Sequence, residues 1–350
     1  MTGPADPYDA APPYPQYPEY PKAPPAAAAH VPPQPRPDHD DLHYRHAPGT
    51  RVHYRARQRS ADATALGRLA LHLPAFLSSL LVVLGTSALS EAWIGLPAWV
   101  PTALWLGSGA LAFHRPSERF LARHLLRLQY PLPAERALLA PVWREVTARA
   151  GVDGDRYELW VEDSNQLNAL AAAGHIVAVT RQALEHLPPA QLAAVLAHEL
   201  GHHTAGHSWA GLLGWWYALP GRLAWRGLTA AVIRLVRVAS GFSYLAAGIL
   251  LVVIGWLALA TLTLTYGLPL LLLVLPYATA AVGRRAELRA DAHAAELGFA
   301  PMLARMLHDV LADESGGAGA RGDLPGLLST HPDHRTRLHH LQRYLEPRGR

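Results

Sequence analysis

The stretch of sequence that decides the fold is His198-Glu199-Leu200-Gly201-His202, which reads H-E-x-x-H. Residues four apart on an α-helix lie on one face, so the two imidazoles of this stretch can bind one Zn²⁺. Glu199 follows the first histidine, and its carboxylate can reach a water molecule on the metal and act as a general base. The pattern is typical of a zinc site that hydrolyses peptide bonds.

The sequence just before this motif predicts the helix that the chemistry needs. Residues 191–197 are strong helix formers, and Pro188-Pro189 precedes them as a helix start signal. An apolar stripe at helical spacing continues into the motif and consists of Leu192, Val195, Leu196 and Leu200. The chain holds 20 histidines, so chance alone produces the five-residue pattern in roughly 5% of such chains, and support from elsewhere is needed.

A catalytic zinc site needs a third protein ligand, and two nearby histidines are poor candidates for it. His203 adjoins His202 and therefore points to another side of the helix. His207 lies one residue short of the third histidine in the pattern H-E-x-x-H-x-x-G-x-x-H, where this chain has Ser208. We therefore interpret His203 and His207 as exposed or second-layer polar residues.

A pair of carboxylates further along the chain is a better candidate. Glu287 and Asp291 lie four residues apart, on one face of a predicted helix. One carboxylate can complete the zinc shell, and the other can orient a ligand imidazole through its second N–H. The alternative is a surface helix stabilised by an Arg–Glu ladder.

Together the motifs resemble those of the HtpX-like membrane metallopeptidases, which are related to the CAAX prenyl proteases. Those enzymes pair H-E-x-x-H with a downstream E-x-x-x-D that usually follows an arginine, as Arg284 precedes Glu287 here. Residues 167–171 resemble their N-A-x-A segment, although Leu170 stands where many members carry an aromatic residue. Residues 329–337 resemble their T-H-P…R block, and the resemblance runs from about residue 69 to residue 341.

The resemblance implies a gluzincin-type site with one Zn²⁺ per chain and a role for each matched residue. Glu199 would be the general base, and Asp291 would orient a histidine ligand. His331 and Arg337 would lie near the zinc and stabilise the oxyanion of the tetrahedral intermediate. Asn168 and Ala169 would bind the substrate backbone at an edge strand above the zinc helix. The metal ligands would be His198, His202 and Glu287.

Two parts of the chain are apolar enough to cross a membrane. Leu69 to Leu89 and Ile94 to Phe113 predict a transmembrane hairpin within residues 61–115, since each run can span a hydrocarbon core of ~30 Å. No residue from 241 to 281 is charged, which corresponds to about 60 Å of helix and predicts two further spans, 242–261 and 265–282. An even number of crossings keeps the two halves of the zinc site on one side of the membrane.

Basic residues flank the predicted spans on the side that carries the motifs. We therefore expect a multi-pass protein of the cell membrane whose catalytic part and N-terminus are cytoplasmic. Residues 209–240 carry tryptophans followed by arginines. This segment is an interfacial helix, a partial span or a cap over the cleft, and the sequence does not decide among the three.

The predicted fold is mainly α with a small β-sheet, in a multi-span helical membrane protein that carries a split zinc peptidase domain. Residues 116–208 form the first half of that domain and residues 284–350 the second, with 209–283 inserted as the interfacial segment and second hairpin. Alternating segments at 157–161 and 175–180 predict strands. The proline-rich residues 1–60 predict a disordered tail, either simply solvated or docked on a proline-reading partner.

Composition narrows the function further. The chain has no cysteine, which excludes disulfides and thiolate ligands. The basic balance, with a pI near 9.4, fits the membrane orientation, and no nucleic-acid-binding motif accompanies it. We expect a membrane-anchored zinc endopeptidase that cleaves membrane or membrane-associated proteins in quality control. The alternatives are a membrane sensor protease that cleaves a cytoplasmic regulator and a non-catalytic, zinc-stabilised membrane scaffold. The sequence indicates neither the substrate nor the oligomeric state.

Overall fold

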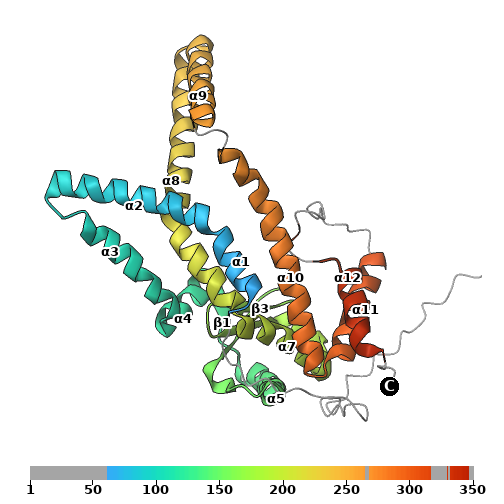
Figure 1. Ribbon diagram of the computed structural model, residues 1–350. Helices are drawn as coiled ribbons and strands as arrows, with labels where there is room; N and C mark the ends of the chain where they lie inside the picture. The colour runs from blue at the N-terminus through green and yellow to red at the C-terminus, as the bar shows by residue number, and fades with distance from the viewer. Residues whose placement is uncertain (1–60, 265–267, 317–328, 330–331, 347–350) are drawn as a thin grey trace, which may run out of the picture. The chain divides into compact units, whose positions relative to one another are not determined.

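The computed structural model describes residues 61–264, 268–316, 329 and 332–346 (Figure 1). The predicted tail 1–60 and the predicted site residue His331 lie outside these residues. Most of the described chain is helical and surrounds one small mixed sheet, so the predicted mainly helical fold class is confirmed.

The sheet has four strands in the order β1-β2-β4-β3. Its strands are β1 (Leu128–Gln129), β2 (Glu158–Glu162), β3 (Ala169–Ala172) and β4 (Ile176–Thr180). β2 and β4 are parallel, whereas β1 and β3 are antiparallel to their neighbours. β3 is therefore an edge strand, as the resemblance implied, and its outer side lacks a partner strand among the described residues.

The register of β3 decides which of its backbone groups face outward. The N–H of Thr180 donates to the carbonyl of Asn168, and Leu170 pairs with Ala178. Alternate residues of an antiparallel strand point their backbone groups to opposite sides. The N–H and C=O groups of Ala169 and Ala171 therefore face away from β4, toward the free edge.

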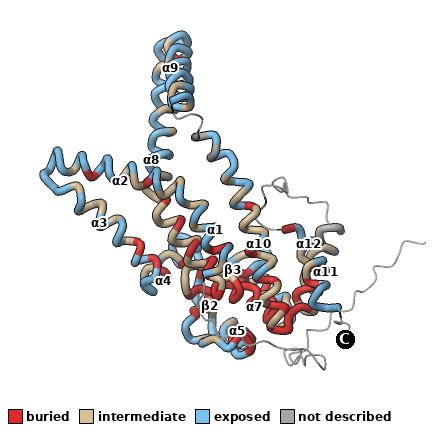
Figure 2. Tube along the Cα trace, viewed as in Figure 1, coloured by how far each residue is buried: buried red, intermediate tan, exposed pale blue. Residues whose placement is uncertain are grey.

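The helix α7 (Pro189–Ala205) carries the H-E-x-x-H motif and lies in the centre of the core. It packs against the sheet and against α5 (Pro133–Ala150), α10 (Leu275–Glu296) and α11 (Ala300–Gly316). Leu196 and Leu200 are fully buried there, and burial of each such side chain contributes roughly 1.5–3 kcal/mol. Figure 2 shows the buried residues gathered along α7 and its neighbours.

A left-handed glycine ends α7 and turns the chain. Gly206 has φ 87°, a conformation that glycine adopts without the strain that a Cβ would add. The next helix, α8, begins immediately at His207 and runs to Phe242. This tight turn brings the first residue of α8 back beside the last turn of α7.

Segment 209–240, whose role the sequence left open, is part of the single helix α8, which continues through Pro220. The helix packs against α1 (Ala63–Leu71), α2 (Leu73–Ile94) and the 3-10 turn η2 (Gly109–Phe113). Past the extended Ser243, α9 (Tyr244–Leu264) lies beside α8 (Figure 1). The remaining helices are α3 (Trp99–Ser108), α4 (Arg115–His124), α6 (Arg181–His186) and α12 (His334–Leu345).

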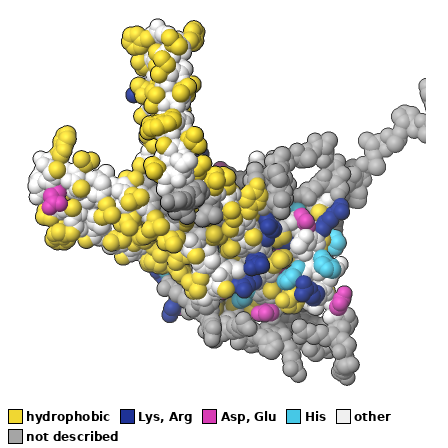
Figure 3. Space-filling model, turned by 45° about the horizontal axis from the view of Figure 1, so that its top comes forward, with side chains coloured by type: hydrophobic (Ala, Val, Ile, Leu, Met, Phe, Trp, Pro, Cys, Tyr) yellow, Lys and Arg dark blue, Asp and Glu magenta, His cyan; other side chains and the backbone are white. Residues whose placement is uncertain are grey.

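Among the residues that the structure describes, two helices are long and apolar enough to cross a membrane. α2 and α9 have 22 and 21 residues, with mean hydropathies of 1.8 and 2.5, and only 17% and 6% of their apolar windows are buried. The interior of a soluble domain does not explain helices this exposed. Hydrophobic side chains cover much of the surface that Figure 3 shows. Both features suggest a membrane protein.

Three of the four predicted spans are not single long helices in the structure. Span 69–89 is interrupted at His72, between the end of α1 and the start of α2. Residues 94–113 comprise the short helix α3 followed by η2. Within 265–282, the described residues form a 3-10 segment, η4 (Leu268–Val274), followed by the start of α10. α10 begins beside Pro276 and continues past Glu287, so one helix joins this apolar segment to the predicted metal ligand.

Candidate metal centre

A glycine allows α7 and α10 to pack almost backbone to backbone. A Cβ added at Gly201 would lie 3.1 Å from Cα of Ala290 and 3.2 Å from Cβ of His293. Since the motif residue at this contact has no side chain, α10 approaches α7 closely. Glu287, nearly one turn before Ala290, then lies opposite the two histidines of the motif.

The three predicted ligands meet at one point. Nε2 of His198 lies 3.5 Å from Oε2 of Glu287, and Nε2 of His202 lies 3.3 Å from Oε1 of the same carboxylate. In a tetrahedral zinc site with ligand distances of ~2.0–2.1 Å, neighbouring ligand atoms lie about 3.3–3.4 Å apart. One ligand atom from each of His198, His202 and Glu287 lies within 4.8 Å of the others, so the three side chains are close enough to hold one metal ion, with the Nε2 atoms of both histidines facing Glu287.

The other ring nitrogen of His198 faces Asp291, as expected for an orienting carboxylate. Nδ1 of His198 lies 2.8 Å from Oδ1 of Asp291, which is fully buried. Burial alone would lower the pKa of His198, but the contacts with Asp291 and Glu287 raise that pKa to about 9. A metal ion that binds Nε2 of His198 would therefore compete with a proton for this ring.

Arg337 reaches this carboxylate from α12. Its Nε and Nη2 atoms donate to the two oxygens of Asp291 at 2.8 and 2.6 Å. Burial would raise the pKa of Asp291, but hydrogen bonds from Arg337 and His198 hold that pKa below its usual range. Arg337 thus lies near the ligand set, as the resemblance implied, and its described hydrogen bonds go to Asp291. Its contact with a reaction intermediate stays a prediction.

Arg284 makes a contact that extends the site toward the predicted T-H-P segment. Its Nη1 donates to the carbonyl of Ser329 at 2.9 Å, and Ser329 is two residues before His331. The placement of His331 itself stays a prediction.

Glu199 lies beside the ligand set, under the edge strand. Its side chain is buried, and the N–H of Ala171 in β3 donates to its carboxylate. Burial is the largest cause of a raised pKa for Glu199, which the neighbouring His198 and His202 oppose. A carboxylate with a raised pKa is a better proton acceptor, so this environment suits a general base.

The predicted substrate-binding residues lie at the start of the same edge strand. Oδ1 of Asn168 accepts from the N–H of Ala169 at 3.0 Å, and the N–H of Asn168 donates to Oγ1 of Thr180. The amide of Asn168 is therefore close to the outward backbone of β3. Its role in holding substrate stays a prediction, and the sequence did not single out Ala171, which contacts Glu199.

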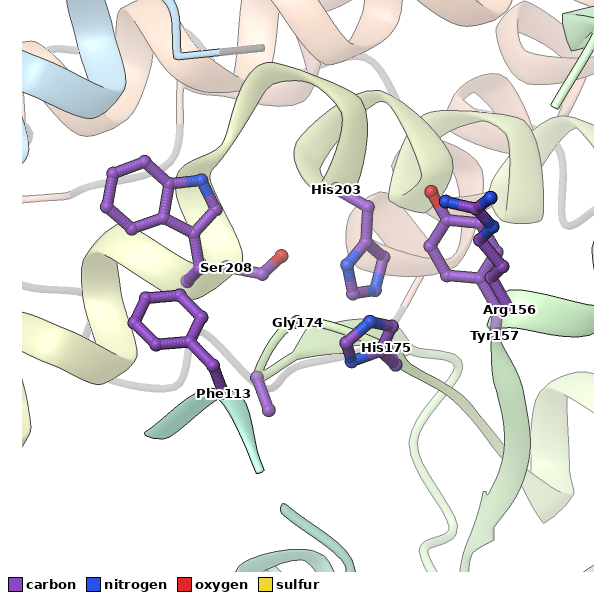
Figure 4. Close-up of a pocket in the computed structure, with 9 residues that line it drawn as sticks. Phe113, Arg156, Tyr157, Gly174, His175, His203 and Ser208 are labelled. Atoms are coloured by element: carbon purple, nitrogen blue, oxygen red, sulfur yellow. The ribbon is translucent and has the colours of Figure 1, made fainter. Parts of the chain in front are cut away.

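His203 faces the sheet and lines a cavity of about 190 Å³ (Figure 4). Its Nε2 donates to the carbonyl of Ile176 at 2.8 Å, and burial lowers the pKa of His203 to about 4. His175, across the cavity, pairs with Glu118 at 3.0 Å. Of the two alternatives for His203, the exposed one is wrong, because the ring is buried and its Nε2 faces Ile176 of the sheet.

His207 is also buried, so for it too the exposed alternative is wrong, and its second-layer role stays a prediction. Its Nδ1 lies 3.1 Å from Nδ1 of His202. Burial is the largest cause of its pKa of about 4, so the ring is neutral at pH 7. The signal in the sequence was Gly206, because a left-handed glycine after α7 returns the next side chain toward the last turn.

The part of the chain that carries the site is similar to known proteins. Residues 133–345 match the sequence profile described as Peptidase family M48. A curated protein described as "Protease HtpX homolog", from Aeropyrum pernix, is 34% identical over 142 residues, which cover 38% of this chain and 43% of that protein. The chain thus spans less than half the length of this relative. The matched range 133–345 contains the three clustered ligands, Glu199 and the Asp291–Arg337 pair.

Proposed function

Because the chain belongs to peptidase family M48, as an HtpX-like member, we propose that it is a membrane-anchored, zinc-dependent endopeptidase. The observation that carries this proposal is the meeting of His198, His202 and Glu287 at one point, with Glu199 beside them. Two imidazoles and a carboxylate leave a fourth tetrahedral position open, which a catalytic site needs and a structural site does not.

Each side chain of the site would have a defined task. When bound, Zn²⁺ would polarise the scissile carbonyl and lower the pKa of the attacking water. Glu199 would accept the proton of that water and pass it to the leaving amine. Asp291 would keep Nδ1 of His198 protonated, so that Nε2 presents its lone pair to the metal. Arg337 would fix Asp291 through its two hydrogen bonds.

The edge strand β3 supplies a place for an extended substrate. The outward C=O groups of Ala169 and Ala171 can accept hydrogen bonds from an extended peptide by β-augmentation, next to Glu199, to which the N–H of Ala171 donates. Backbone pairing of this kind accepts many sequences. It fits a protease that acts on exposed, unfolded segments of membrane or membrane-associated proteins, as in quality control.

The membrane part of the proposal rests on α2 and α9. Both are long, apolar and largely exposed. α9 packs against α8, which precedes it, so these two helices can form a hairpin between the two halves of the zinc site and leave both halves on one side of the membrane. Basic residues near the catalytic part favour a cytoplasmic site at the cell membrane.

Removal of the metal tests the peptidase proposal. We expect the purified full chain in detergent to cleave casein, to lose this activity with 1,10-phenanthroline, and to regain it when one Zn²⁺ per chain is restored. The measurements are metal content by elemental analysis and peptide release. A protein that holds one zinc ion per chain but does not cleave casein or detergent-solubilised membrane proteins would instead support the non-catalytic scaffold.

Extraction of membranes tests the anchoring. We expect the full chain to stay in the membrane pellet after treatment with carbonate at pH 11 and to dissolve only in detergent. Carbonate disrupts electrostatic attachment to the membrane, but it does not extract helices with about 20 apolar residues each from the hydrocarbon core. A peripheral membrane protein of known behaviour is the control. Release of the chain by carbonate would contradict the assignment of α2 and α9 as spans.

A further inference from the structure

We propose that His207, Asp62 and Thr64 position the second metal ligand, His202, and thereby connect the start of the first helix to the metal centre. The inference rests on the metal site of the proposed function. It adds three residues that lie outside the H-E-x-x-H and E-x-x-x-D motifs, two of which lie outside the range that matches the family.

The contacts form an unbroken chain that begins at the outer face of His202. Nδ1 of His202 lies 3.1 Å from Nδ1 of His207. Nε2 of His207 lies 2.5 Å from Oγ1 of Thr64 and 3.2 Å from Oδ1 of Asp62. His207 and Thr64 are buried, so little water competes for these contacts.

Metal binding fixes the direction of the hydrogen bonds. When Nε2 of His202 gives its lone pair to a metal, the neutral ring carries its proton on Nδ1 and can only donate there. Nδ1 of His207 must then accept, which leaves the proton of His207 on Nε2, facing Thr64 and Asp62. Oγ1 of Thr64 in turn donates to Oδ1 of Asp62 at 2.7 Å. Every donor in this direction meets an acceptor, so one arrangement of protons satisfies the whole chain.

Asp62 is itself held from several sides. It caps α1 by accepting from the N–H groups of Thr64 and Ala65, and its Oδ2 contacts Nη1 of Arg289 at 2.5 Å. Its own N–H donates to the carbonyl of Ala205, at the end of α7. Asp62 therefore joins α1, α7 and α10. Arg289 is only two residues after the ligand Glu287.

Both ligand histidines thus have a neighbour at Nδ1, a carboxylate for His198 and an imidazole for His202. His198 contacts Asp291, which is paired with Arg337. His202 contacts His207, and His207 contacts Asp62, which is paired with Arg289. A partner on the outer nitrogen fixes the tautomer and the orientation of a ligand imidazole, and its loss typically weakens metal binding by 10–100-fold.

Two substitutions of His207 separate hydrogen bonding from packing. In His207→Asn the side-chain oxygen replaces Nδ1 and can still accept from His202. In His207→Gln the side-chain nitrogen replaces Nε2 and can still reach Asp62, but nothing accepts from His202. We expect His207→Gln to bind Co²⁺ on the order of 10–100-fold more weakly than the wild type and His207→Asn to stay within about fivefold of it.

The measurement uses the chelator-treated full chain in detergent. Co²⁺ affinity is taken by competition with a chromophoric chelator, and the visible absorption of bound Co²⁺ reports the ligand geometry. Asp62→Ser keeps the cap of α1 but withdraws the oxygen from His207, so we expect weaker Co²⁺ binding without loss of helix content. The matched control is His203→Gln, which alters an adjacent buried histidine whose nitrogen donates to Ile176, away from the metal.

The outcomes separate this inference from the proposed function. Wild-type affinity and an unchanged absorption spectrum in His207→Gln would overturn the positioning role of His207. An equal loss in His207→Asn and His207→Gln would also overturn it, since it would trace the effect to packing. A wild-type chain that binds neither Zn²⁺ nor Co²⁺ would instead contradict the proposed metal site itself.

Discussion

Replacing Glu199 by Gln is expected to lower kcat for peptide hydrolysis by about 10²–10⁴-fold, with metal content unchanged. Gln has nearly the same shape and can still accept from the N–H of Ala171, but it cannot take a proton from water. The carboxylate of Glu199 is not among the three clustered ligand groups, so the metal should remain bound. The measurements are peptide release under saturating substrate and zinc content per chain.

The matched control is Glu185→Gln, which removes one negative charge from an exposed position of α6 in the same domain. We expect this variant to keep wild-type kcat. Turnover by Glu199→Gln within tenfold of the wild type, at equal zinc content, would contradict the assignment of Glu199 as general base. An inactive variant that retains the metal can also hold substrates, so its capture from native membranes would identify the proteins that the enzyme cleaves.

The sequence predicted those parts of the site that depend on helical spacing. His198 and His202 are four apart, as are Glu287 and Asp291, and a helix places such pairs on one face whatever surrounds them. The meeting of the two pairs could not be derived from spacing, because His202 and Glu287 are 85 positions apart in the chain. The family resemblance supplied that step, and the close contact at Gly201 gives its physical reason.

The support of His202 was not predicted, because it depends on a tertiary contact between distant segments. Asp62 and His207 are 145 positions apart, and an aspartate before a helix is normally explained by capping alone. Only the folded chain shows that the capping oxygen of Asp62 also faces an imidazole. The left-handed conformation of Gly206 brings His207 against His202, which the spacing of the histidines alone does not show.

The positions at which the apolar helices begin and end were harder to predict than the apolar segments themselves. Hydropathy finds a run of uncharged residues but does not show where a helix stops inside it. The predicted span 265–282 contained the missing signal: Pro276 lacks an N–H and is favoured in the first turn of a helix, and α10 begins at Leu275. The start of α10 could therefore have been placed from the sequence.

Replacing Gly201 by Val is expected to separate α7 from α10 and to weaken Zn²⁺ binding by on the order of 10–100-fold. A Cβ alone would lie 3.1 Å from Cα of Ala290, and the methyl groups of Val extend further toward α10. Overpacking of this kind costs about 1–3 kcal/mol and is relieved by a shift of the backbone. Such a shift moves Glu287 away from the histidines, since it lies on the same helix as Ala290.

The effect on stability and on Zn²⁺ affinity should increase with the size of the side chain at position 201. In Gly201→Ala, the gain of about 1 kcal/mol in helix propensity opposes a smaller clash, so the thermal midpoint of the metal-free chain should change little. In Gly201→Val the clash should dominate, and both the midpoint and the Zn²⁺ affinity should fall. The control is Gly227→Val in α8, where an added Cβ meets nothing within 4 Å. Equal Zn²⁺ affinity in Gly201→Val and the wild type would show that the approach of α10 does not set the position of Glu287.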